Sequence, residues 1–260
     1  MKRYLSALLM MLMASLACNV GIPNLVRGSG NIITETFEVS RFDQVELSTV
    51  GEVHIEQGDT ESVTVETDDN IMALVVVKVD GSKLTLSLRE NTNIDPSALT
   101  FNVTVKELSH VIALSSGDIF AGPIRGDSLD ILANASGNVN LESVEANNFS
   151  VTAGGSGNVT VDNIDVESVH SAARASGAIQ IAGTATSHTV EVGGSGGVDA
   201  GDLQTSTAEV TVKASGDVTV WVSDTLDVSI NGSGNVNYYG DPTITQDISG
   251  SGELTSLGEK

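Results

Sequence analysis

The chain has 260 residues, of which 40% are hydrophobic and 3% aromatic, and its 34 acidic residues against 12 basic ones give a formal net charge of −22. A surface this acidic repels nucleic acids and anionic lipid headgroups, so we expect neither as a partner. The single cysteine excludes a disulfide framework, and the regularly spaced aliphatic residues exclude an acidic disordered chain.

The first residues have the pattern of a secretory signal. Two basic residues precede a short apolar run, which predicts a signal peptide over residues 1–17. The only cysteine, Cys18, follows the small residue Ala17 as in a bacterial lipobox, although that motif prefers Leu where this chain has Ser15. We therefore predict a lipid anchor on Cys18, followed by a linker over residues 18–30. An ordinary signal peptide with a cysteine near its cleavage region is the alternative.

Residues 31–113 contain several short segments in which apolar and polar residues alternate, which is typical of β-strands with one buried face. The Asp-Gly pair at residues 80–81 predicts a hairpin turn, and residues 89–100 read as a loop. Asp68 and Asp69 lie together between two strands, where we expect a turn rather than a metal site. We expect this N-terminal β section to continue into the next part of the chain and to be less regular.

Residues 114–256 repeat a Ser-Gly corner at intervals of 18 to 20 residues. The eight corners, three of them extended by an asparagine, are Ser116-Gly117, Ser136-Gly137-Asn138, Ser156-Gly157-Asn158, Ser176-Gly177, Ser195-Gly196, Ser215-Gly216, Ser233-Gly234-Asn235 and Ser251-Gly252. An aliphatic residue stands three positions after every corner serine, and period-two alternation flanks each corner. A unit this short cannot close its own core, so successive units must stack.

The repeat predicts an all-β fold, a parallel β-solenoid whose coils lie ~4.8 Å apart, with a short tail at residues 257–260. We expect the corners to be structural. Each would turn the backbone, with a small residue before every serine allowing adjacent coils to pack closely. The stacked Ser and Asn side chains could hydrogen-bond from coil to coil.

The order of these segments resembles a known family. The stretch "GSGNIITETFEVSRFDQVELSTVGEVHIEQG", then "DGSKLTLSL", then the serial SGN and SGD coils ending in "NYYGDPTITQDISGSGEL" are similar to the "putative autotransporter adhesin head GIN domain" over residues 30–256. The resemblance implies an exported bacterial protein with a right-handed parallel β-helix, often carried behind a lipoprotein signal. It implies no catalytic residue.

Metal and base chemistry find little support in the sequence. The calcium-binding nonapeptide requires an Asp where "GGSGNVTVD" has Val159, so that match fails. The Asn and Asp residues that follow most corners could bind Ca²⁺ along one edge, but a solvated polar ladder is the favoured interpretation.

None of the four histidines has metal-ligand spacing with another His or Cys. His188 takes a position that is apolar in other coils, so we expect a partly buried packing residue. We predict no catalytic residue, no cofactor and no metal.

An enzyme on the same scaffold is the main alternative, because parallel β-helices also carry polysaccharide lyases and hydrolases. Such sites need convergent basic or paired acidic side chains. Arg174 and Lys213 share one repeat position but lie on non-adjacent coils. Sugar-binding faces use aromatic platforms, for which Trp221, Tyr238 and Tyr239 are the candidates, and Trp221 should point outward.

The sequence therefore predicts a non-enzymatic, exported or cell-surface β-solenoid with an adhesin-like or binding role. Its partner would be an extracellular or envelope protein or a glycan, and it would contact the membrane only through a lipid anchor. The alternatives are a carbohydrate-active enzyme and a structural or sensory envelope protein that docks a protein partner. The terminal strand in "SGSGEL" has few charges to block edge pairing, so self-association through the last coil is a further expectation.

Overall fold

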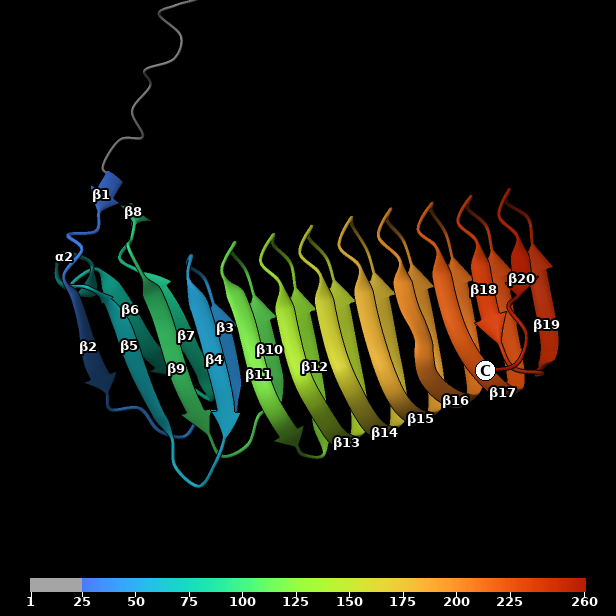
Figure 1. The fold of residues 1–260 in the computed structure, drawn as a ribbon, viewed down its shortest axis with the longest axis horizontal. Coiled ribbons are helices and arrows are strands. Elements are labelled where there is room, and N and C mark those ends of the chain that lie inside the picture. The colour runs from blue at the N-terminus through green and yellow to red at the C-terminus, as the bar shows by residue number, and fades with distance from the viewer. Residues whose placement is uncertain (1–24) are drawn as a thin grey trace, which may run out of the picture.

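The structure, a computed structural model, describes residues 25–260 and is nearly all β, with 64% strand and 2% helix. It forms a β-solenoid of about 7 turns with a less regular N-terminal region, which confirms the predicted fold class. Figure 1 shows the N-terminal section at the left and the regular coils stacked toward the right. The predicted signal peptide and Cys18 lie outside the described residues.

The regular coils are built from parallel strands whose bounds follow the corners. They are β10 (His110–Ala113), β11 (Asp118–Arg125), β12 (Ser128–Ala133), β13 (Val139–Ala153), β14 (Val159–Ala173), β15 (Ile179–Val192), β16 (Val198–Val212), β17 (Val218–Ile230), β18 (Val236–Tyr239), β19 (Thr243–Ile248) and β20 (Leu254–Ser256). From β13 to β17 one long, bent strand fills each coil between two corners. The pairing register equals the sequence repeat, as where Val139 faces Val159 and Val159 faces Ile179.

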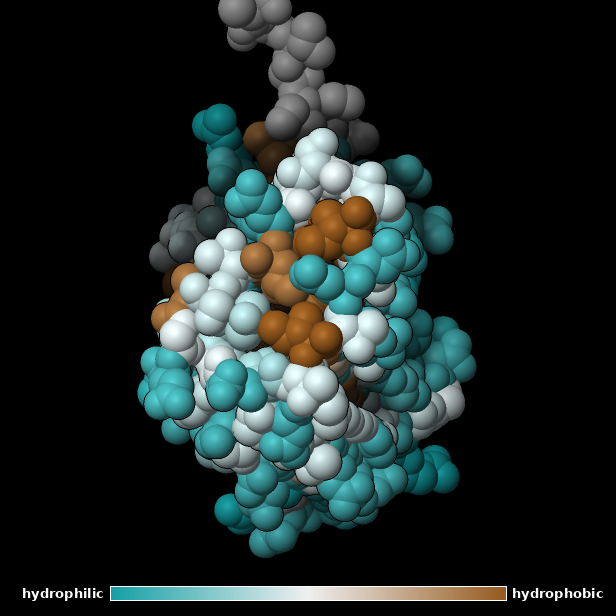
Figure 2. Space-filling model, turned by 90° about the vertical axis from the view of Figure 1, so that its right-hand side faces the viewer, coloured by the Kyte–Doolittle hydropathy of each residue, from teal (hydrophilic) through white to brown (hydrophobic). Residues whose placement is uncertain are grey.

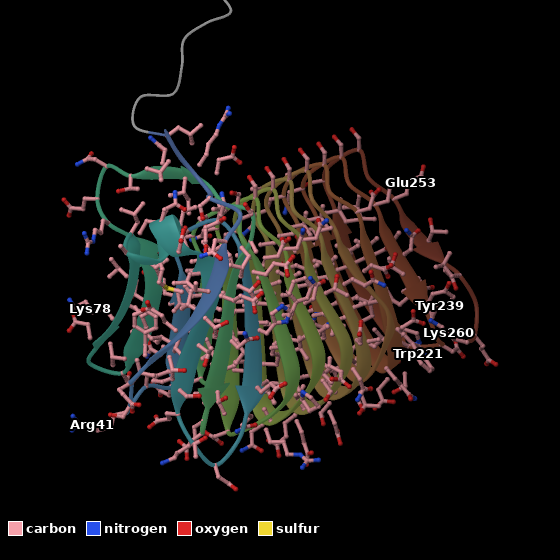
Figure 3. All side chains as sticks on the ribbon, turned by 60° about the vertical axis from the view of Figure 1, so that its left-hand side comes forward. Arg41, Lys78, Trp221, Tyr239, Glu253 and Lys260 are labelled. Carbon is pink, nitrogen blue, oxygen red and sulfur yellow. The ribbon has the colours of Figure 1, made fainter. Side chains whose placement is uncertain are left out.

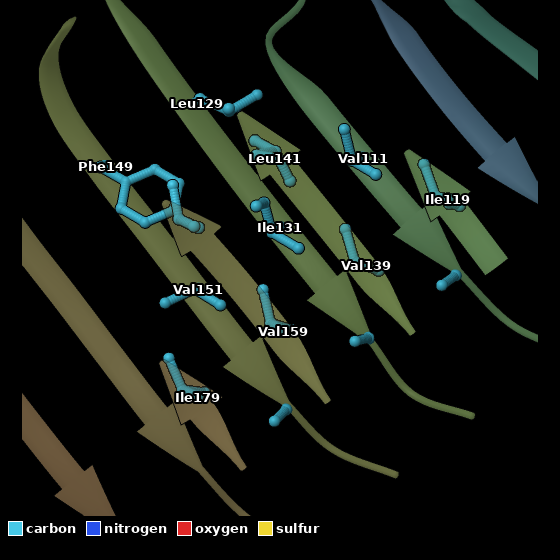
Figure 4. Close-up of a cluster of buried hydrophobic side chains, with 14 of the residues drawn as sticks. Val111, Ile119, Leu129, Ile131, Val139, Leu141, Phe149, Val151, Val159 and Ile179 are labelled. Atoms are coloured by element: carbon cyan, nitrogen blue, oxygen red, sulfur yellow. The ribbon is translucent and has the colours of Figure 1, made fainter. Parts of the chain in front are cut away.

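The core consists of aliphatic columns that run along the rod axis. One column places Phe149 of β13 beside Leu129 of β12, and a second contains Ile131 and Val151. Figure 4 shows these side chains stacked between the two walls of the coil. All four are at most 2% exposed. Burial of a side chain of this size contributes about 1.5–3 kcal/mol, so each coil is stabilised mainly by the coils on either side of it.

The N-terminal section combines parallel coils with antiparallel insertions. Its elements are β1 (Leu25–Arg27), β2 (Ile32–Phe37), β3 (Gln44–Leu47), β4 (Glu52–Gln57), β5 (Ser62–Asp68), α2 (Asp69–Met72), β6 (Val75–Asp80), β7 (Lys83–Leu88), β8 (Asn93–Asp95) and β9 (Leu99–Val105). The predicted hairpin is present as β6–β7, turning at Gly81 with φ +63°. β3 and β4 pair in parallel with β10 and β11, so the rod continues into this section. The predicted loop over residues 89–100 contains β8, which pairs with β1.

Asp68 links separate segments of the N-terminal section through hydrogen bonds. Its carboxylate is buried and accepts hydrogen bonds from the backbone N–H of Gly30 at 2.7 Å and of Ser97 at 2.8 Å. Burial alone would raise the pKa of Asp68, but these backbone hydrogen bonds outweigh it and hold the pKa below its ordinary value. Asp69 accepts hydrogen bonds from the side chains of Ser29 and Asn31. No helix in residues 25–260 has the length and apolar character needed to cross a membrane.

Candidate binding surface of the rod

The corner glycines stack so tightly that no side chain fits between them. A Cβ on Gly157 would lie 1.9 Å from the carbonyl oxygen of Gly137, and one on Gly137 would lie 1.9 Å from that of Gly117. The first regular corner rests in the same way on residues 49–51, because the N–H of Asp118 donates to the carbonyl of Gly51 at 3.0 Å. Glycine is therefore required here by the close approach of two backbones.

The corner serines form a row of exposed hydroxyls along one edge of the rod. All eight are exposed, whereas every corner glycine is buried. The corners line up in the loops at the top of Figure 1. Within residues 25–260 none of the eight hydroxyls is engaged in an intramolecular hydrogen bond, so the expected coil-to-coil bonding of these serines is absent. We refer to these eight side chains, defined by the corners given above, as the hydroxyl row.

The residue after the corner serves a different purpose, because its side-chain oxygen binds the next coil. Asp118 Oδ1 accepts from the backbone N–H of Asn138 at 2.6 Å, and Asn138 Oδ1 accepts from that of Asn158 at 3.1 Å. Asn158 Oδ1 in turn accepts from the N–H of Ala178 at 2.9 Å. The expected coil-to-coil bonding of asparagine is therefore present. The ladder is interrupted at Ala178 and Gly197 and starts again at the next corner with Asp217, whose Oδ1 accepts from the backbone N–H of Asn235 at 2.7 Å.

This ladder leaves little for a metal ion to bind. Its amide oxygens and one oxygen of each aspartate accept hydrogen bonds from backbone amides, and aspartate occurs in it only at separate coils. Across residues 25–260 no group of three or more His, Cys, Asp or Glu side chains is placed to hold a metal ion.

His188 is more deeply buried than the partial burial that we expected from its repeat position, at 2% exposure. Its Nε2 lies 2.9 Å from Ser171 Oγ, which is also buried, so this Ser-His pair has no access to a substrate. Burial, followed by the charge of His170, lowers the pKa of His188 to about 3. The imidazole is therefore neutral at ordinary pH.

The two basic residues that share a repeat position and the other histidines do not come together in one site. Arg174 and Lys213 are exposed on separate coils and form no ion pair within the described part of the chain. His54 stacks on Phe120 with ring centroids 5.3 Å apart. His110 lies 3.7 Å from a carboxylate oxygen of the neighbouring coil.

The aromatic residues of the last coils form a cluster that sequence reasoning did not assemble. Trp221 of β17 pairs in register with Tyr239 of β18, and both are half-buried. Lys260 places its ammonium over both rings (Figure 3). The two aromatics each stand six residues after a corner serine, which was the available sequence signal. No sequence signal indicated that the C-terminal tail would place Lys260 beside these two rings. Tyr238, in contrast, packs partly against the core.

The far end of the rod is an uncovered coil. All six residues of β19 are exposed, and Ile244 and Ile248 are 36% and 39% exposed although their partners on β17 are buried. Figure 2 looks onto this end, where hydrophobic side chains gather near the middle. Self-association through this coil stays a prediction.

Comparison with known proteins gives the same fold. The family described as "Putative auto-transporter adhesin, head GIN domain" matches residues 41–242. A "putative lipid binding protein" from Parabacteroides distasonis has 27% identity and a TM-score of 0.83, with 90% of this chain and 99% of that chain covered. A "putative adhesin" from the same species has 25% identity and a TM-score of 0.81, with 90% and 100% covered.

A "putative adhesin" from Parabacteroides merdae shares the fold at 23% identity, with a TM-score of 0.80 and coverage of 90% of this chain and 99% of that chain. No curated protein matches the chain in sequence. The family match extends over well over half of the chain and confirms the resemblance that the sequence suggested. The protein therefore belongs to the family described as "Putative auto-transporter adhesin, head GIN domain".

Proposed function

We propose that this protein is a non-enzymatic, exported binding rod of the cell envelope or cell surface with an adhesin-like role. The family and the related structure named a "putative adhesin" at 25% identity support this direction. The observation that carries it is the hydroxyl row, eight exposed serines at equivalent positions of successive coils. The stacking of the coils sets these hydroxyls ~4.8 Å apart in a line.

Such a row suits many weak contacts made together. A single neutral hydrogen bond contributes only about 0.5–1.5 kcal/mol, which is too little for stable binding by itself. Rigid spacing makes each further contact intramolecular, so affinity rises with the number of hydroxyls engaged. A repetitive polar ligand, such as a glycan or an extended protein segment, would match this geometry.

Lipid binding, which one relative has in its name, finds less support in this chain. A surface hollow with a volume of about 580 Å³ lies beside β4 and β11. Its lining includes Glu56, Arg125 and Glu142. Charged walls of this kind would leave an acyl chain beside groups that remain hydrated.

A pair of serine variants tests the role of the hydroxyl row. Ser156→Ala with Ser176→Ala removes two adjacent hydroxyls of the row, and Ser187→Ala with Ser223→Ala removes two serines away from the corners. Wild type and both variants are applied to arrays of glycans and extracellular matrix proteins. We expect ligands that bind wild type to lose at least about fivefold in affinity with the corner variant only, as two lost hydrogen bonds imply. Equal loss in both variants, or sugar release from any glycan, would contradict the proposal.

Exposure on the cell is tested separately with the native host. Intact cells are treated with protease, and the protein is followed by antibody, beside a Cys18→Ala variant. We expect digestion of wild type and release of the variant into the medium, because lipidation of Cys18 would provide the anchor. Full protection of wild type on intact cells would exclude a surface role.

A further inference from the structure

Lys260 is held by four groups that together surround its ammonium. The Nζ atom donates to the carbonyl oxygen of Gly201 at 2.6 Å and forms an ion pair with Asp202. It lies 4.9 Å from the ring centroid of Tyr239 and 5.6 Å from that of Trp221. Figure 3 shows the lysine beside the two aromatic side chains at the far end of the rod.

The chemistry of these groups fits a primary ammonium. Two oxygens accept two of its three N–H donors, and two aromatic faces attract the positive charge. A quaternary ammonium would satisfy the rings but could not donate to the oxygens. A guanidinium has a planar fork that suits a bidentate carboxylate rather than this arrangement of one carbonyl and one carboxylate oxygen.

The charge of the rod favours an incoming cation. Residues 126–260 contain 18 acidic side chains and only three basic ones, and Lys260 is one of the three. A field of this sign raises the local concentration of positively charged partners and speeds their approach.

The site is filled from within the chain but is open to solvent. The tail runs beside β18, where the N–H of Leu257 donates to Tyr238 at 2.8 Å and Gly240 donates to the carbonyl of Gly258 at 2.9 Å. The Lys260 side chain remains 32% exposed and that of Asp202 70% exposed. Two backbone hydrogen bonds at the surface are a weak restraint, so another ammonium can compete for the same place.

We propose that Trp221, Tyr239, Asp202 and the carbonyl of Gly201 form a binding site for the primary ammonium of a lysine side chain on a partner protein. Lys260 occupies this site in the free protein and is displaced when the partner binds. The idea rests on the proposed binding function, and it adds a specific contact at one end of the rod to the repetitive contacts of the hydroxyl row.

Trp221 makes the site directly observable, because it is the only tryptophan of the chain. The probe is the acetylated, amidated tripeptide Gly-Lys-Gly, titrated into the full chain while tryptophan fluorescence is recorded. Lys260→Gln removes the internal ammonium and leaves a neutral, unbranched polar side chain, and Lys213→Gln is the matched control for lost charge. A tethered group competes at a millimolar effective concentration, so we expect the apparent Kd to be roughly two- to tenfold lower for Lys260→Gln than for wild type. Lys213→Gln should behave as wild type.

Two further variants in the Lys260→Gln background separate the site from general electrostatics. Asp202→Asn should abolish saturable binding, whereas Asp227→Asn makes the same charge change at an exposed position of β17 and should leave binding intact. Nε-trimethylation of the probe should weaken binding, because it removes the N–H donors.

The proposal is overturned if Lys260→Gln shows no saturable fluorescence change, if it binds no better than wild type, or if Asp227→Asn loses as much as Asp202→Asn. Binding of free 1,5-diaminopentane without binding of the tripeptide would overturn the assignment to a lysine of a polypeptide. Failure here is distinguishable from failure of the proposed function, because neither the protease experiment nor the corner-serine variants involve this site.

Discussion

Acid should destabilise the rod through a single buried imidazole, that of His188. In the unfolded chain this side chain takes up a proton near its ordinary pKa of 6.5, whereas burial, with the charge of His170, lowers its pKa to about 3 in the folded chain. Between these two values the unfolded chain holds a proton that the folded chain does not. The free energy of unfolding therefore falls as the pH falls through this window.

The size of the effect follows from the shift in pKa. Each unit corresponds to 1.36 kcal/mol, so His188 should cost about 3 kcal/mol of stability at pH 4 relative to neutral pH. The test variant combines His188→Leu with Ser171→Ala, because removal of the imidazole alone would leave a buried hydroxyl without a partner. Leucine suits this column, which already contains Leu129 and Leu226.

Urea unfolding followed by circular dichroism at pH 7, 6, 5 and 4 measures the difference between wild type and the double variant. We expect wild type to lose about 3 kcal/mol more than the variant over this range, since the carboxylates that also titrate are common to both. His110→Leu, which removes a partly exposed imidazole, serves as the control and should follow wild type. Parallel pH curves for wild type and the double variant would refute the reasoning, as would an NMR titration of folded His188 with a midpoint near 6.5.

Two other predictions test the packing of the rod. Gly157→Ala should reduce the free energy of unfolding by about 2–4 kcal/mol, because its Cβ would overlap the carbonyl of Gly137. Gly193→Ala is the control, since a Cβ there meets nothing within 4 Å, and its free energy of unfolding in the same urea assay should stay within ~0.5 kcal/mol of wild type. Asp68→Asn should increase the rate of amide hydrogen exchange about tenfold at Gly30 and Ser97, whose backbone N–H groups donate to the Asp68 carboxylate. Unchanged protection of these two amides would contradict the role of Asp68 in holding the N-terminal section together.

The regular part of the rod was predictable because its contacts repeat with the sequence. Val159 stands three residues after Ser156 and is buried, and its neighbours in the stack are the residues one repeat away on either side. Where residues in contact are separated by one repeat along the sequence, the period of the sequence determines the strand register. The aliphatic columns and the corner positions follow from that period alone.

The N-terminal section and the ammonium site lack this relation. Asp68 reaches Gly30 and Ser97 across separations of 38 and 29 residues, which no period links. Lys260 contacts Asp202 over 58 residues, through a tail that leaves the repeat. Such contacts depend on how the chain closes in space, and residue type alone does not determine them. The depth of His188 exceeds the prediction for a related reason, since a histidine in an apolar column is buried by its neighbours whatever its own preference.

The two polar rows at the corners differ in a way that bears on function. The oxygens of the Asn and Asp ladder bind backbone amides of the next coil, yet the ladder is interrupted at Ala178 and Gly197 without a break in the stack. Its side chains therefore support the coils, and the fold tolerates their replacement. The serines show the opposite relation, because they occupy all eight corners while their hydroxyls engage no other described residue. The recurrence of serine at every coil without an internal contact supports the proposal that these hydroxyls bind a group outside the rod. This contrast favours the hydroxyl row, rather than the Asn and Asp ladder, as the surface that meets a partner.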